Sequence, residues 1–226
     1  MQGGVSRVLE PLSVAIGLSG VGDLVAIWRG IRPLRYLFKP GTMALIIALG
    51  AAGLPEAGPY GFLILAGLLC SLAGDIFLVL PRSRFLAGLT AFFCAHLLYI
   101  AAFLWRASQD LAALPGAPWA TALLVAVLLA AGVHLFRRVR PGVLREGGAR
   151  LLVPVGLYIC VISLMALSAA VTGSAAVLAG ALLFCISDTI LAWNRFVRPL
   201  PRADLGVMST YFAAQYLIAA SVLAVN

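Results

Sequence analysis

Charged side chains are scarce in this 226-residue sequence, where they make up only 11% of the residues. Hydrophobic residues make up 63%, whereas ordinary soluble domains are about 45–50% apolar and about 25% charged. A soluble globule cannot use so much apolar surface, because it must still coat itself with polar groups. The composition therefore predicts an integral membrane protein whose helices face lipid.

Several kinds of functional site are missing as well. The sequence has no Gly-x-Ser-x-Gly elbow, no His-Glu-x-x-His, no phosphate-binding loop and no dinucleotide fingerprint. Its two histidines fall at different depths, which excludes a three-histidine zinc site. The four cysteines lie in apolar runs without metal-type spacing, so we expect packing residues, neither disulfides nor metal ligands. The net charge of +8 is spread over short arginine clusters, which argues against a nucleic-acid partner.

Long apolar runs predict an all-α, polytopic bundle of about eight transmembrane helices. A span needs roughly 20 residues with few charges. The first run is weakened by Glu10, Pro11 and Asp23, and the second is short. The predicted spans are Val8–Trp28, Gly41–Leu54, Tyr60–Leu80, Phe85–Trp105, Trp119–Phe136, Leu151–Ala170, Ala175–Trp193 and Leu205–Val225.

The basic residues test this count independently, because positively charged loops mark the cytoplasmic side. Alternate loops carry 14 of the 16 basic residues, which predicts that both termini lie on the non-cytoplasmic side. These loops hold Arg29, Arg32, Arg35 and Lys39, then Arg82 and Arg84, then Arg137, Arg138, Arg140, Arg145 and Arg150, and finally Arg195, Arg198 and Arg202.

The chain also has the pattern of an internal duplication. Leu-Ala-Gly at 65–67 precedes Asp75 by the spacing at which Leu-Ala-Gly at 178–180 precedes Asp188. Pro40 and Pro154 repeat at nearly the same offset. An even number of spans in each unit makes this a parallel four-plus-four repeat, with units 1–110 and 111–226 inside one transmembrane domain, 1–226.

Two aspartates are the main candidates for chemistry. An ionisable group inside a span costs about 2.5–3.5 kcal/mol, so it is a functional candidate by default. Asp75 and Asp188 each lie five residues from the predicted cytoplasmic end of their spans, about 8 Å inside that boundary. Matched depth on repeat-related helices permits a facing pair. The structural alternative is that each makes interhelical hydrogen bonds only, and for Asp23, in the weaker first span, we take that alternative.

Other polar residues would line the space above the aspartates. His96 and Tyr99 share a helix face, as do Tyr211 and Gln215, and Tyr158 follows Pro154 by one turn. A packed tyrosine with a satisfied hydroxyl is the alternative for each of these tyrosines. Lys39, the only lysine, could receive a lipid phosphate or simply extend to the headgroups. We assign the arginine clusters no catalytic role.

The sequence resembles the YhhN family of eight-span membrane proteins, which includes lysoplasmalogenases. The resemblance runs from about residue 36 to 216. It rests on Tyr36-Leu37-Phe38-Lys39-Pro40, on Ser71-x-x-Gly74-Asp75 followed by Phe85, Gly88, Phe93, His96 and Tyr99, on Pro154 with Tyr158, and on Ser187-Asp188 followed by Tyr211 and Gln215.

The resemblance implies a hydrolase that cleaves the vinyl ether bond of a lysophospholipid, in a multi-pass protein of the bacterial inner membrane. It implies that Asp75 and Asp188 are the catalytic carboxylates, and we expect the remaining polar residues to bind substrate: Lys39, Ser71, His96, Tyr99, Tyr158, Ser187, Tyr211 and Gln215. Vinyl ether hydrolysis needs one protonated carboxyl and one carboxylate, as glycosidases do, and no cofactor. A small transporter with proton-relay carboxylates and a non-catalytic lipid-binding protein are the alternatives, and the oligomeric state stays open.

Overall fold

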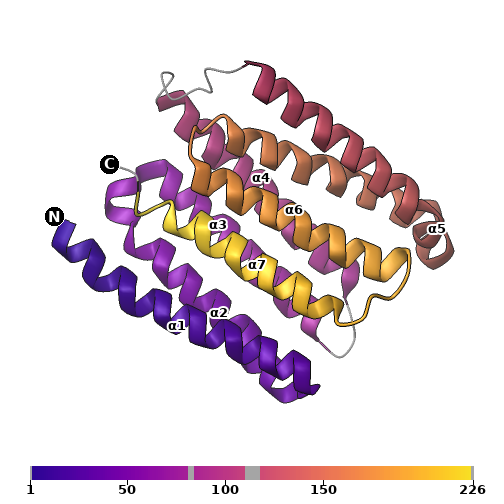
Figure 1. Ribbon diagram of the computed structural model, residues 1–226, viewed down its shortest axis with the longest axis horizontal. Coiled ribbons are helices and arrows are strands. Elements are labelled where there is room, and N and C mark those ends of the chain that lie inside the picture. The colour runs from indigo at the N-terminus through magenta and orange to yellow at the C-terminus, as the bar shows by residue number, and fades with distance from the viewer. Residues whose placement is uncertain (1, 81–83, 110–117, 225–226) are drawn as a thin grey trace.

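The computed structural model describes residues 2–80, 84–109 and 118–224 of the chain, and these residues form helices without any strand. The predicted all-α class is therefore confirmed. Figure 1 shows the helices as a bundle of long, roughly aligned rods. They are α1 (Gln2–Arg29), α2 (Arg32–Ala52), α3 (Leu54–Val79), α4 (Phe85–Gln109), α5 (Pro118–Ala170), α6 (Ala175–Phe196) and α7 (Ala203–Ala220).

Helix α5 consists of two rods that meet at Gly148. A straight helix of its 53 residues would be about 80 Å long, more than twice the hydrocarbon thickness of a bilayer. Gly148 has φ 61° and ψ −156°, a conformation that only glycine adopts readily. Figure 1 shows that α5 folds back on itself. We predicted a loop across residues 137–150, and this was wrong, because the segment is helical on both sides of a one-residue break.

Helix α2 begins nine residues before its predicted span at Gly41. Its first turn contains Pro33, whose fixed φ suits the start of a helix. The earlier start places Arg35 and Lys39 four residues apart on one face of a helix instead of in a loop. The two cations therefore point the same way, and Lys39 is buried.

The packing of the helices brings the two halves of the chain together. Helix α7 lies between α2 and α6, and α2 also packs on α1 and α3 (Figure 1). Helix α4 packs on α3 and on α5. The aspartate-bearing helices α3 and α6 are thus joined through α7 and through the α4–α5 contact.

Two glycines let α3 and α4 approach closely. A Cβ at Gly67 would lie 2.3 Å from the Tyr99 ring, and one at Gly74 would lie 2.7 Å from the Phe92 ring. Each ring therefore fills the space that a side chain on α3 would need. The aromatic side chains of α4 are fixed by this contact, in a region where helix association depends on small residues.

Five helical segments are long and apolar enough to cross a membrane, among the residues that the structure describes. They are Leu9–Arg29, Leu54–Val79, Phe85–Gln109, Trp119–Ala170 and Ala175–Phe196. Helix α2 is not among them and carries Arg32, Arg35 and Lys39 in its first half, and α7, which is not among them either, has only 18 residues. The eight spans and the orientation therefore stay predictions.

The close contact at Gly67 yields a stability prediction. Gly67→Ala should lower the melting temperature of the detergent-purified protein, because its Cβ must displace the buried Tyr99 ring, and overpacking of this kind costs about 1–3 kcal/mol. Gly17→Ala is the matched control, since no atom lies within 4 Å of its Cβ position. Equal melting temperatures for the two variants would contradict the close packing.

Candidate active site

Asp75 is a buried carboxylate with a donor on each oxygen. It lies near the C-terminal end of α3 and is 2% exposed. The Lys39 ammonium lies 3.0 Å from Oδ1, and the Tyr211 hydroxyl donates to Oδ2 over 2.6 Å. Helices α2, α3 and α7 therefore meet at this one side chain.

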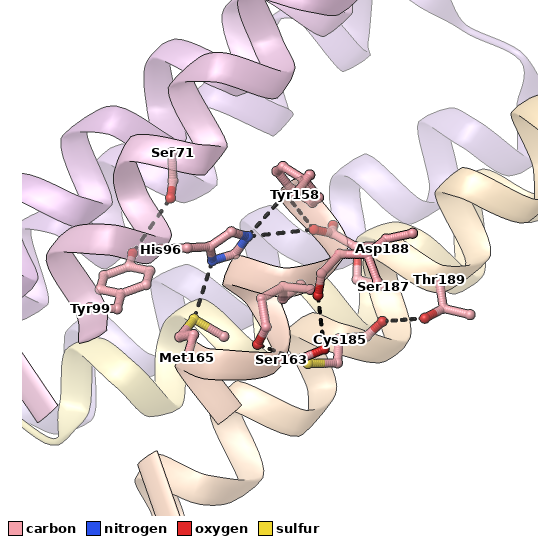
Figure 2. Close-up of polar contacts among 12 residues, drawn as sticks. Ser71, His96, Tyr99, Tyr158, Ser163, Met165, Cys185, Ser187, Asp188 and Thr189 are labelled. Carbon is pink, nitrogen blue, oxygen red and sulfur yellow. Dashed lines mark hydrogen bonds and ion pairs between the residues drawn. The ribbon is translucent and has the colours of Figure 1, made fainter. Parts of the chain in front are cut away.

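Asp188 stands in a second polar cluster on α6. The Tyr158 hydroxyl donates to its Oδ2 over 2.5 Å, and His96 Nε2 lies 3.7 Å from the same oxygen. His96 Nε2 is also 3.0 Å from the Tyr158 hydroxyl, and its Nδ1 lies 3.2 Å from the sulfur of Met165. Figure 2 shows this fully buried imidazole pointing toward Asp188 and Tyr158.

The remaining predicted site residues lie beside these two clusters. The Tyr99 hydroxyl donates to Gln215 Oε1 over 2.8 Å, and Ser71 Oγ lies 3.5 Å from the same hydroxyl. Ser187 Oγ donates to the backbone oxygen of Val207 over 3.1 Å. Tyr99, Gln215 and Ser71 are all buried and form a hydrogen-bonded group inside the bundle, and none of the three lines either of the two cavities beside the aspartates.

An aromatic side chain joins the two aspartate clusters. Phe184 on α6 is fully buried, and its ring centroid lies 4.7 Å from that of His96 and 5.4 Å from that of Tyr211. Both contacts are edge-to-face, which is a favoured geometry for aromatic pairs. The hydrogen-bond partner of Asp75 and the histidine beside Asp188 are thus held against one ring.

A polar cavity of about 510 Å³ contains both aspartates on its wall. Its cations come from the start of α2 and the end of α6, and Tyr211 lies on the α7 side. The polar cavity is lined by Arg32, Arg35, Tyr36, Lys39, Asp75, Leu78, Val79, Leu80, Phe85, Phe92, Ser187, Asp188, Leu191, Asn194, Arg195, Asp204, Val207, Met208 and Tyr211.

An apolar cavity of about 570 Å³ lies on the other side of Asp188, between α4, α5 and α6. Its few polar residues include His134 and Ser163. The apolar cavity is lined by Leu78, Phe85, Leu89, Phe92, Leu128, Ala130, Ala131, Gly132, His134, Leu135, Val155, Tyr158, Ile159, Ile162, Ser163, Cys185, Asp188, Thr189, Leu191, Ala192, Trp193, Arg195 and Phe196.

The two cavities adjoin, and Asp188 is on their common wall. Besides Asp188, both are lined by Leu78, Phe85, Phe92, Leu191 and Arg195. Asp75 lines the polar cavity alone. Asp188 therefore has a polar cavity on one side and an apolar cavity on the other.

Sequence analysis missed the charged residues at the rim of the polar cavity. Arg35 and Asp204 form an ion pair of 2.8 Å between α2 and α7, and Arg195 pairs with Glu146 and covers the Phe85 ring at 3.8 Å. Helical spacing could have identified them. Arg195 is seven residues after Asp188, and Asp204 is seven before Tyr211, so each shares a helix face with a site residue.

Comparisons with known proteins identify the relatives of this chain. The sequence profile of the YhhN family matches residues 34–222. Lysoplasmalogenase TMEM86B of Homo sapiens is 38% identical over 74% of this chain and 66% of its own length, and that of Sus scrofa is 38% identical over 80% and 71%.

A bacterial relative matches a shorter part of the chain. The uncharacterized membrane protein YhhN of Escherichia coli O157:H7 is 41% identical over 38% of this chain and 41% of its own length. No solved structure matches the chain. The family profile covers most of the sequence and includes both aspartates, and we conclude that the chain belongs to the YhhN family.

Proposed function

We propose that this chain is a membrane hydrolase that cleaves the vinyl ether bond of a lysoplasmalogen to a fatty aldehyde and a glycerophospho-base. Relatives named lysoplasmalogenase, 35–38% identical over 74–80% of the chain, support this function. The observation that carries it is the position of Asp188 on the wall between a polar and an apolar cavity.

The two cavities suit the two ends of a lysophospholipid. Its single alkenyl chain fits the apolar cavity, and its phosphate fits the polar cavity, where Arg32, Arg35 and Arg195 provide cations. The vinyl ether joins the chain to the glycerol, so it falls at the common wall beside Asp188. The opposite polarity of the two cavities sets the orientation of the lipid. Moving the phosphate into the apolar cavity, or the alkenyl chain into the polar cavity, would cost free energy.

The hydrogen bonds suggest which aspartate holds the proton. Both oxygens of Asp75 accept, from Lys39 and from Tyr211, which suits a carboxylate. At Asp188, the hydrogen bonds among the described residues involve Oδ2 alone, which leaves Oδ1 for a proton directed at substrate. Asp188 also faces the apolar cavity, where the β-carbon of the vinyl ether would lie. We assign Asp188 as the acid and Asp75 as the base.

These roles give a complete catalytic cycle. Asp188 gives its proton to the β-carbon, and the resulting oxocarbenium ion is attacked at the α-carbon by water as Asp75 takes a proton from that water. The hemiacetal then collapses. Asp188 removes the hydroxyl proton and Asp75 protonates the leaving glycerol oxygen, so that aldehyde and alcohol leave and both aspartates return to their starting states.

The other polar side chains would position the reacting groups. Tyr158 and His96 orient Asp188, and Tyr211 and Lys39 orient Asp75. Ser187 lines the polar cavity, so we assign it to the glycerol. Tyr99 and Gln215, with Ser71 beside them, form a separate hydrogen-bonded group outside the two cavities, and we assign these three a supporting role in the site. In this scheme the main role of Lys39 is to pair with Asp75, and binding of the phosphate is its secondary role.

We also propose the eight-span, four-plus-four topology for this site, in a bacterial inner membrane. The two rods of α5 bring the helical rods to eight within the described residues. Asp75 is contacted by Lys39 of the second rod and Tyr211 of the eighth, and Asp188 by Tyr158 of the sixth and His96 of the fourth. In a parallel four-plus-four duplication each rod corresponds to the rod four places later. The second rod, which contacts Asp75, then corresponds to the sixth, which contacts Asp188, and the fourth rod corresponds to the eighth in the same way.

Replacing either aspartate should slow turnover strongly. Asp75→Asn and Asp188→Asn should fold but release fatty aldehyde from a lysoplasmalogen about 10²–10⁴ times more slowly, because each loses a proton-transfer group. Aldehyde release by purified protein in detergent is the measurement, with Glu56→Gln, an exposed acid in the first turn of α3, as the matched control. Wild-type-like turnover in either variant would refute the assignment, and movement of lipid without aldehyde would favour a transporter.

Filling the apolar cavity should shorten the preferred chain. Gly132→Leu projects into this cavity, where the Cβ itself meets only ordinary contacts at Ile159 and Ser163. We expect KM to rise about tenfold or more for the longest alkenyl chains, a loss of about 1.4 kcal/mol, and to change little for short ones. Val133→Leu, on the exposed face of the same helix, is the control. A KM increase independent of chain length would argue against this placement.

The topology can be tested with reporter fusions. Alkaline phosphatase fused after the C-terminus should be active and green fluorescent protein at the same point dark, because the basic loops hold the opposite side in the cytoplasm. Fusions after Arg145 should give the reverse pattern. A fluorescent C-terminal fusion would overturn the proposed orientation.

A further inference from the structure

Asp23 is a buried carboxylate that the scheme above does not use. It lies on α1, is 0% exposed, and neither of its oxygens has a hydrogen-bond partner among the described residues. The structural hydrogen bond that we expected from the sequence is therefore not formed. Its helix otherwise presents apolar side chains outward, among them Leu18, Val21 and Val25. A charge buried at a membrane depth without a partner carries a cost that needs an explanation.

The packing of α1 on α2 determines which part of α2 lies opposite Asp23. Ser19 and Thr42 are joined by a hydrogen bond of 2.8 Å, and a Cβ at Gly22 would lie 2.8 Å from the Phe38 ring. These two contacts define the register of an antiparallel helix pair, which brings Asp23 opposite the stretch of α2 between Arg35 and Thr42. Lys39 lies in this stretch and is buried.

The charges around Asp23 agree with this register. Arg35 has the strongest electrostatic influence on Asp23, followed by Lys39 and then by the acids Asp75 and Asp204, and Asp23 forms an ion pair with neither cation among the described residues. Arg35 pairs with Asp204 through one terminal nitrogen, and its buried Nε has no hydrogen-bond partner among the described residues. The Lys39 ammonium has three N–H donors, and its contact with Asp75 uses one of them. Of these two cations, only Lys39 contacts Asp75 among the described residues, so Lys39 is the cation through which Asp23 can act on Asp75.

We propose that Asp23 is a positioning residue that acts on Asp75 through Lys39, as the second counter-ion of the buried ammonium. The inference rests on the proposed function. When Asp75 takes a proton from the attacking water, Lys39 loses its partner, and an unpaired ammonium at this depth is costly. Asp23 keeps Lys39 neutralised during that part of the cycle. It never touches the substrate, so its removal should slow the chemical step and leave binding unchanged.

This role separates Asp23 from a structural residue. Because its oxygens have no partners to lose, Asp23→Asn should keep or raise the melting temperature while kcat falls about tenfold or more, with KM within about twofold of wild type. Asp23→Glu, which keeps the charge, should recover part of the lost kcat. Ser19→Ala, one turn away on the same helix contact, is the matched control, and it should lower the melting temperature and leave kcat unchanged.

A double-mutant cycle tests the route through Lys39. In a Lys39→Met background, Asp23→Asn should cause no further loss of kcat, and it should raise the melting temperature above that of Lys39→Met alone, since it removes the acid left without a counter-ion. Wild-type kcat in Asp23→Asn, or independent effects of the two substitutions on both kcat and melting temperature, would overturn the inference.

The same experiment keeps the two proposals apart. If the wild-type protein releases no aldehyde, the proposed function fails, and the thermal coupling between Asp23 and Lys39 still decides whether they act as a pair. If the wild type is active and Asp23→Asn equals it, the inference about Asp23 fails and the hydrolase stands.

Discussion

The compensation of buried charge is the constraint on which the rest of this structure depends. An ionised group deep in an apolar bundle is tolerated only when donors or counter-ions surround it. Asp75 meets this condition with Lys39 from α2 and Tyr211 from α7, which draws three helices to one point. Asp188, which holds the proton in the proposed cycle, accepts a hydrogen bond from Tyr158, and His96 lies close by. The same constraint makes Asp23 informative, because neither of its oxygens has a partner among the described residues and it faces the stretch of α2 that contains Lys39.

The two aspartates have different surroundings in the two halves of the chain. In the first half, Gly67 and Gly74 let the rings of Tyr99 and Phe92 pack directly on α3, which closes that helix contact. In the second half, α6 leaves a cavity between itself, α4 and α5. Only one aspartate of the pair therefore lines the apolar cavity, and this asymmetry allows the two carboxyls to take different roles in the proposed cycle.

Residue types and depth predicted much of the site. Asp75, Asp188 and His96 were candidates because a polar group in a span is costly, and the structure brings them, with Tyr158 and Tyr211, into two hydrogen-bonded clusters beside adjoining cavities. The sequence failed where hydropathy was the only signal. Residues 137–150 are polar, yet they are helical, because arginine and leucine favour helix and Gly148 alone interrupts it. Arg35 was assigned to a loop for the same reason.

The sequence by itself determined the class of the protein, the positions of its acids along the helices and the order of most helices, because these depend on composition and on distance along the chain. It could not determine which side chains meet. Tyr211 and Asp75 are 136 residues apart, and their contact depends on how far each helix is rotated about its axis and on which helices are neighbours. Only the tertiary packing fixed those rotations, through contacts between small and aromatic side chains, and with them the two adjoining cavities and the position of Asp188 between them.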